Sequence, residues 1–142
     1  MNNTIKAVAL GLSLLLVGVW YAQDFDKGSA AYKKKDYAAA LREWRPLAEK
    51  GDADAQFIVG AMYEYGQGVP QNAAEAVKWY RLAAEQGYEV AQFIVGAMYQ
   101  DGQGVPQNAA EAVKWYRLAA DQGNGGAQFA LDVMYGKIQG LP

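Results

Sequence analysis

The chain has 142 residues, contains no Cys and no His, and carries a formal net charge of -2. Without thiolate or imidazole groups it lacks the ligands of the usual zinc and iron–sulfur sites, and it lacks the nucleophiles and bases of Cys- and His-dependent hydrolases. The small negative charge gives no general attraction for phosphate backbones, so we expect no nucleic-acid binding. Only carboxylates, Tyr and Lys remain for acid–base chemistry, and capping and i,i+4 ion-pair positions account for most of the carboxylates. The sequence therefore predicts no catalytic residue, no metal and no cofactor.

Residues 1–22 have the pattern of a secretory signal peptide. One positive charge precedes an apolar stretch from Ala7 to Val19, and Ala22 is a suitable small residue before a cleavage site. Trp20 fits the cleavage preference poorly, however, and the stretch is only slightly shorter than a membrane span, so a retained N-terminal anchor stays open as an alternative. Both forms place the remaining domain, 23–142, in the periplasm or outside the cell, with membrane contact only through an uncleaved segment.

The part of the domain that follows, residues 24–50, is predicted to form two helices, 24–34 and 36–50. Pro46 lies inside the second helix, where it removes a backbone hydrogen bond and favours a kink. The lysines at 33–35 suit a solvated helix end, where cations complement the helix dipole. A docking patch for an anionic partner is the alternative.

The next part of the chain is an internal repeat with a period of 36 residues, because 55–87 and 91–123 differ at only three positions. A further copy begins at 127–136 and soon ends. Such a period is typical of a solenoid, whose units bury their apolar faces by stacking on their neighbours. The three differing pairs are Glu64/Gln100, Tyr65/Asp101 and Glu85/Asp121.

Each unit is predicted to contain two helices, which we call helix A and helix B. In the first unit, Asn72 and Glu75 form a predicted capping box at the start of helix B, and Gly87 ends that helix. Apolar residues recur on one stripe of helix B at Ala76, Trp79, Tyr80 and Ala83. The predicted helices of the repeats are 53–65, 73–86, 89–101, 109–122 and 125–136, which gives seven helices in total.

The septet GQGVPQN, at 66–72 and again at 102–108, links helix A to helix B. A phosphate-binding loop would require a Lys-Ser/Thr ending and a preceding strand, and neither is present. Glycine ends the first helix, proline prevents its continuation and asparagine begins the next one. The septet is therefore predicted to be a structural joint.

The motifs A-Q-x-x-x-G-x-M-Y, G-x-G-V-P, A-x-x-W-Y-x-x-A-A and E-Q-G resemble the Sel1-like repeat, a relative of the tetratricopeptide repeat, over residues 36–136. Residues 24–50 resemble a tetratricopeptide unit. The resemblance implies an all-α fold, a right-handed solenoid of stacked antiparallel helix pairs. It divides the domain into a lead unit at 24–50, repeats at 53–87 and 89–123, and a truncated capping repeat at 125–142.

Most members of the resembling family act as adaptor scaffolds, so we expect a non-catalytic protein that binds a protein or peptide. Some cysteine-rich secreted members bind or hydrolyse β-lactams. Here Ser29 is followed by AAYK, which breaks the S-x-x-K spacing of that chemistry. A cell-wall glycan-binding or β-lactam-binding envelope factor, and a secreted effector, stay open as alternatives.

The candidate binding site is a concave groove along the A helices. All four Phe fall at one repeat position, which in the tetratricopeptide family lines the groove; the alternative is that their rings fill the seams between adjacent A helices. The neighbouring positions at which the repeats differ are expected to supply selectivity. The candidate residues are Phe25, Phe57, Phe93, Phe129, Glu64, Tyr65, Gln100 and Asp101.

The last copy differs from the others at Asp132, which matches Gly60 and Gly96. In the complete units this glycine is expected to allow helix B to approach closely. A carboxylate there is expected to face water, with 125–136 acting as a terminal cap. The tail from Lys137 is expected to be mobile.

Overall fold

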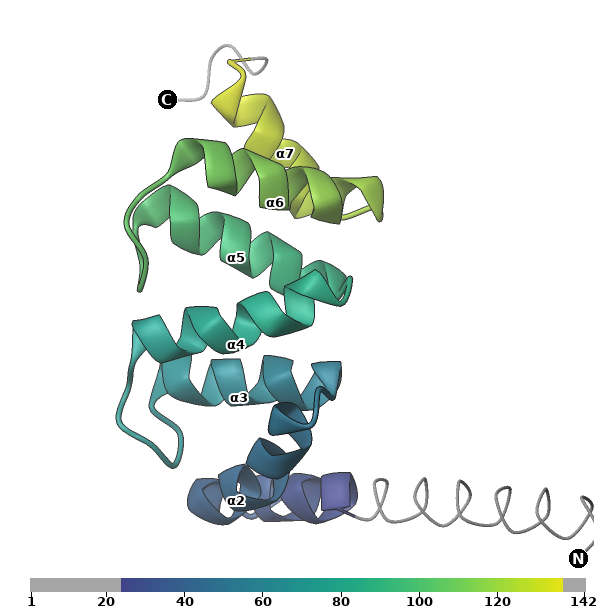
Figure 1. Cartoon of the computed structure of the whole chain (residues 1–142), viewed down its shortest axis with the longest axis vertical. Helices are drawn as coiled ribbons and strands as arrows, with labels where there is room; N and C mark the ends of the chain where they lie inside the picture. The colour runs from purple at the N-terminus through teal and green to yellow at the C-terminus, as the bar shows by residue number, and fades with distance from the viewer. Residues whose placement is uncertain (1–23, 137–142) are drawn as a thin grey trace, which may run out of the picture.

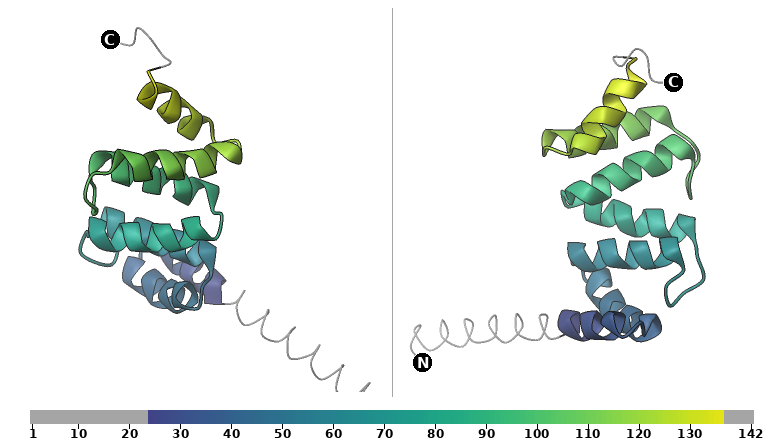
Figure 2. Two further views of the ribbon diagram at one scale, coloured as in Figure 1. Left: turned by 45° about the horizontal axis from the view of Figure 1, so that its top comes forward. Right: turned by 180° about the vertical axis from the view of Figure 1, so that it is seen from behind.

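The computed structural model describes residues 24–136 as a stack of helices, without a strand in that range. Neighbouring helices run in opposite directions along the stack, and the two ends of the described chain lie at opposite ends of it (Figure 1). Figure 2 shows the same order of stacking from two further directions. The helices are residues 24–33, α2 (Tyr37–Glu49), α3 (Ala53–Tyr65), α4 (Ala73–Glu85), α5 (Glu89–Asp101), α6 (Ala109–Asp121) and α7 (Gly125–Met134).

This arrangement confirms the predicted all-α right-handed solenoid of stacked helix pairs, and the helix bounds agree with the prediction to within two residues. Residues 24–33 pair with α2, α3 pairs with α4, and α5 pairs with α6. The helix α7 occupies the position of a fourth helix A. Helix α2 continues through Pro46 to Glu49. The predicted signal segment, 1–22, and the tail from Lys137 lie outside the described residues.

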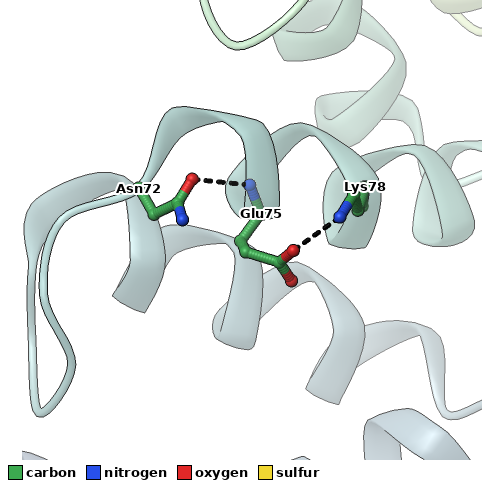
Figure 3. A network of polar contacts seen from close by, with 3 residues as sticks. All are labelled: Asn72, Glu75 and Lys78. Carbon is green, nitrogen blue, oxygen red and sulfur yellow. Dashed lines mark hydrogen bonds and ion pairs between the residues drawn. The ribbon is translucent and has the colours of Figure 1, made fainter.

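Side-chain caps begin most of the helices. The Asn72 side-chain oxygen accepts a hydrogen bond from the Glu75 backbone N–H at 3.1 Å (Figure 3), and Asn108 caps α6 in the same way. The predicted capping box is wrong in its second half, because the Glu75 carboxylate pairs with Lys78 Nζ at 2.6 Å instead. The Asn72 backbone N–H already donates to the Tyr63 carbonyl at 2.9 Å, so it needs no carboxylate partner.

The GQGVPQN septets are joints that dock on the preceding unit. Gly66, with a φ of 66°, ends α3, and Gly68 has a φ of 73°. A Cβ on Gly68 would lie 2.6 Å from the carbonyl carbon of Tyr37, the first residue of α2. In the second copy, a Cβ on Gly104 would lie 2.2 Å from the Ala73 carbonyl oxygen at the start of α4. The second glycine of each septet therefore allows backbone to pack directly on backbone.

A glycine of helix A lies under an aromatic ring of helix B in each complete pair. A Cβ on Gly60 would lie 2.8 Å from Tyr80 Cδ1, and one on Gly96 would lie 2.7 Å from Tyr116 Cδ1. This close approach was predicted from the sequence. The lead pair has the same contact between Gly28 and Trp44. These contacts align the lead unit with the repeats independently of sequence identity.

Asp132 takes the place of this glycine in α7, where it is partly exposed and accepts a hydrogen bond from Gln128 Nε2 at 3.1 Å. No helix B follows α7 within residues 24–136, so the glycine is not required there for close packing.

A pair of glutamines ties three consecutive helices together. Gln92 is 4% exposed and donates from Nε2 to the Ala84 carbonyl of α4 at 3.1 Å. Gln122, at the end of α6, donates to Gln92 Oε1 at 2.8 Å and to the Gly87 carbonyl at 3.1 Å. Gln56 and Gln86 form the same contacts one repeat earlier. The A-Q and E-Q-G motifs mark these residues, but their role was not inferred from the sequence.

We expect Gln92→Ala to lower the free energy of unfolding by about 2 kcal/mol, because it removes two hydrogen bonds of a buried side chain at roughly 1 kcal/mol each. The matched control is Gln128→Ala, at the same repeat position in α7, where the side chain is exposed. That change is expected to cost no more than about 0.5 kcal/mol. Urea denaturation compares the two variants, and equal losses would contradict the role of the glutamine pair.

Candidate functional site

Two clefts open on the surface formed by helix 24–33, α3, α5 and α7, which we call the A-helix face. The first cleft has a volume of about 400 Å³ and lies between the lead pair and α3. The last cleft has a volume of about 290 Å³ and lies between the third pair and α7. Both are lined mainly by apolar and aromatic side chains, which suits the burial of apolar groups from a partner.

The two clefts are the same site at two junctions of the solenoid. The glycine contacts align helix 24–33 with α3 at an offset of 32 residues. They align α2 with α4, and each later helix with its equivalent in the next unit, at an offset of 36 residues. With these offsets, six lining positions of the first cleft recur in the last one, two junctions along the stack. The pairs are Tyr32/Gln100, Trp44/Tyr116, Phe57/Phe129, Ile58/Ala130, Ala61/Val133 and Met62/Met134.

The phenylalanines predicted as groove residues contact helix B wherever a helix B is present. Phe25 packs against Trp44, with ring centroids 5.8 Å apart, and Phe57 and Phe93 pack against Tyr80 and Tyr116 at 5.4 and 5.7 Å. These three rings are half-buried. Phe57 lines the first cleft and Phe93 the last, so both contribute to the seam within a pair and to the A-helix face.

Phe129 differs from the other three because α7 has no helix B beside it among the described residues. It is 54% exposed and lines the last cleft. Its neighbour Val133, also in that cleft, is 48% exposed. Phe129 is therefore the most exposed phenylalanine of the predicted site.

The predicted selectivity residues lie at the ends of α3 and α5. The Tyr80 hydroxyl donates to Glu64 Oε2 at 2.5 Å, and the Tyr116 hydroxyl donates to Gln100 Oε1 at 2.9 Å. Burial, and then the hydrogen bond to Glu64, raise the pKa of the Tyr80 hydroxyl well above its ordinary value. Glu64 and Gln100 thus hold the tyrosines of helix B, and Gln100 also lines the last cleft.

The next residues along these helices, Tyr65 and Asp101, are exposed. Burial, and then the charge of Asp101, raise the pKa of the Tyr116 hydroxyl. Asp101 directly follows Gln100, which lines the last cleft. The structure thus gathers Phe93, Gln100 and Phe129 in one cleft and places Phe57 in the other.

Sequence reasoning missed the lining residues that are neither Phe nor divergent between the repeats. Met62 and Met134 follow the cleft phenylalanines by five residues, and Trp44 and Tyr116 come from helix B. The signal was present in the repeat itself, since Met62 recurs as Met98 and Met134, and Tyr80 recurs as Tyr116, at the period of 36 residues.

The fold and the repeat motifs agree with one family of proteins. The Sel1 repeat matches residues 53–88 and 90–124. The chain belongs to the Sel1 repeat family. Sel1-repeat proteins generally serve as scaffolds for protein–protein interaction, and the family is typically non-catalytic.

The chain is also similar in sequence and fold to solved structures of Sel1-repeat proteins. A Sel1 repeat protein from Oxalobacter formigenes is 38% identical, with a TM-score of 0.71, over 78% of this chain and 45% of that one. The protein c5321, a protective antigen present in uropathogenic Escherichia coli strains, is 37% identical, with a TM-score of 0.78, over 82% of this chain and 26% of that one. The Sel1-repeat chain therefore spans less than half the length of these two relatives.

The cysteine-rich protein B of Helicobacter pylori shares the fold at 23% identity, with a TM-score of 0.61, over 64% of this chain and 68% of that one. No curated protein matches the sequence.

Several acidic side chains of the helices take part in ion pairs at i,i+3 and i,i+4 spacing. One example is Arg81 with Glu85 at 3.4 Å, as predicted from the sequence. Residues 24–136 contain no group of three or more metal-ligating side chains that could hold an ion. Within the same range, no helix is both long and apolar enough to cross a membrane.

Proposed function

We propose that this Sel1-repeat protein is a non-catalytic scaffold that binds a protein or an extended peptide on its A-helix face, in the periplasm or outside the cell. The observation that carries the proposal is the occurrence of one apolar cleft at two junctions on the same face. A catalytic site usually requires a single constellation of acid, base or nucleophile. A cleft repeated along a solenoid instead suits a partner that extends along the stack.

The exposure of the cleft side chains supports the same proposal. Tyr32, Phe129 and Val133 are among the exposed large hydrophobic residues, and all three line one of the two clefts. Apolar side chains that gather on one face of a soluble protein mark an interaction surface more often than scattered ones do. Truncation of such a residue is therefore expected to weaken binding without unfolding the protein.

We expect Phe129→Ala to weaken partner binding by about 2 kcal/mol, which is roughly a thirtyfold loss of affinity, while the melting temperature changes little. The reason is that Phe129 is 54% exposed and has no helix B packed against it among the described residues. The measurement is a titration with a partner isolated from envelope extracts by the intact protein, together with a thermal melt of the variant.

Two variants serve as controls for this experiment. Leu118→Ala removes a side chain of α6 that is 42% exposed and lines neither cleft, so binding and stability should both be retained. Phe93→Ala removes a half-buried ring that packs against Tyr116, so it should lower stability by about 2 kcal/mol. Equal binding by the Phe129 and Leu118 variants would contradict a site on the A-helix face.

The proposed location depends on the signal segment. Cleavage after Ala22 would remove none of the described residues, which begin at Asp24. N-terminal sequencing of the protein from envelope fractions is therefore expected to begin at Gln23. An intact Met1 in the membrane fraction would identify a retained anchor, and recovery of the full chain from the cytosol would contradict both forms.

A further inference from the structure

The junctions of the A-helix face differ in charge at one position. The alignment of the units places three residues at one equivalent repeat position, which is the last residue of helix A in three consecutive pairs. These residues are Lys33, Tyr65 and Asp101. The series therefore runs from a positive charge through a neutral aromatic residue to a negative charge. It follows the order of the stack, from the end at helix 24–33 toward α7 (Figure 1).

The two charged members of this series lie beside the two clefts. Lys33 lines the first cleft, and Lys34 and Lys35 follow it in an exposed turn. No ion pair of Lys33 is found within residues 24–136. Asp101 directly follows Gln100, which lines the last cleft, and its charge acts on Tyr116 in the same cleft. The first cleft is therefore basic at its rim and the last cleft is acidic.

We propose that the A-helix face binds an extended peptide in one polarity. An apolar side chain next to an acidic residue occupies the first cleft, and an apolar side chain next to a basic residue occupies the last cleft. This inference rests on the proposed function and adds the chemistry of the partner. If the acidic and basic residues of the peptide occupied the opposite clefts, each would face a residue of the same charge on the protein. The charges at the two rims therefore disfavour that arrangement.

The separation of the clefts sets the length of such a peptide. Two repeats, or four helix layers at roughly 8–10 Å each, separate the first cleft from the last, which is on the order of 35 Å. An extended chain spans about 3.3 Å per residue, so about ten residues separate the two apolar side chains.

The test is a selection of random peptides of about sixteen residues, displayed on phage, against the immobilised full-length chain. Enriched peptides are expected to carry two apolar residues about ten positions apart, with Asp or Glu beside one and Lys or Arg beside the other. The variant Asp101→Lys, in which both rims carry a lysine, should instead enrich peptides with Asp or Glu beside both apolar residues. The same charge composition with both proteins would overturn the inference.

Single substitutions test the first cleft separately. Lys33→Asp is expected to weaken a peptide selected on the unchanged protein about fivefold, because an exposed ion pair contributes up to about a factor of five. The matched control is Arg42→Asp, which makes the same charge change at an exposed residue of α2 outside both clefts and should leave affinity unchanged. Equal losses in the two variants would indicate a general charge effect and overturn the inference.

The selection also separates this inference from the proposed function. Enriched peptides that lose binding with Phe129→Ala but show no order of charges would overturn the polarity and leave the binding face in place. A selection that yields no peptide dependent on the A-helix face would overturn both, and would favour another class of occupant, such as a glycan.

Discussion

Tyr80→Ala is expected to lower the free energy of unfolding by about 4 kcal/mol, as is typical for the loss of a buried aromatic side chain. Tyr80 is 1% exposed, and its ring lies against Gly60 and packs against Phe57 with centroids 5.4 Å apart. Its removal would leave a cavity between α3 and α4 at the centre of the stack. Urea denaturation followed by circular dichroism measures the loss.

The matched variant Tyr80→Phe separates the ring from the hydroxyl. It retains the packing and removes only the hydrogen bond to Glu64, so we expect a loss of about 1–2 kcal/mol. Equal losses for the two variants would show that the hydrogen bond, and not the ring, stabilises this pair of helices.

Gly104→Ala is expected to cost at least about 3 kcal/mol, because two unfavourable effects coincide in the joint. The residue has a φ of 71°, which L side chains rarely adopt, and its new Cβ would lie 2.2 Å from the Ala73 carbonyl oxygen. Since the neighbour is backbone at the start of α4, relief requires the joint to move away from the preceding unit. Thermal and urea denaturation both measure this effect.

Gly87→Ala provides the control, because Gly87 has a φ of 90° but nothing lies within 4 Å of the point that its Cβ would occupy. That variant should lose only about 1–2 kcal/mol, the cost of the left-handed conformation. A similar loss in both variants would contradict the direct docking of the joint on α4.

The binding predictions and these stability predictions concern different parts of each unit. Tyr80 and Gly104 hold neighbouring helices in place, whereas Phe129 and Lys33 lie at the rims of the clefts. Variants of the first kind should unfold the stack, and variants of the second kind should alter its affinity. This division allows a scaffold to change its partner without a change of fold.

The sequence alone determined the architecture, because the signals for helix ends lie in short segments of the chain and recur in each repeat. Asn72 and Gly66 mark helix ends through their own backbone preferences, and the period of 36 residues requires that the units stack alike. The close approach of helix B at Gly60 also followed from the repeat, since a glycine that recurs inside a helix usually reflects packing.

Only the tertiary structure decided what surrounds each of these residues. Phe93 and Phe129 are equivalent in sequence, yet one packs against Tyr116 and the other is exposed, because only the first has a helix B beside it among the described residues. Glu75 fits a capping box in sequence, yet the Asn72 N–H already has a carbonyl partner from α3.

The position of the charged run at 33–35 is a further example. Lys33 lies beside a cleft only because of the way in which α3 packs against the lead pair. Such contacts join residues from different helices, and no local pattern specifies them.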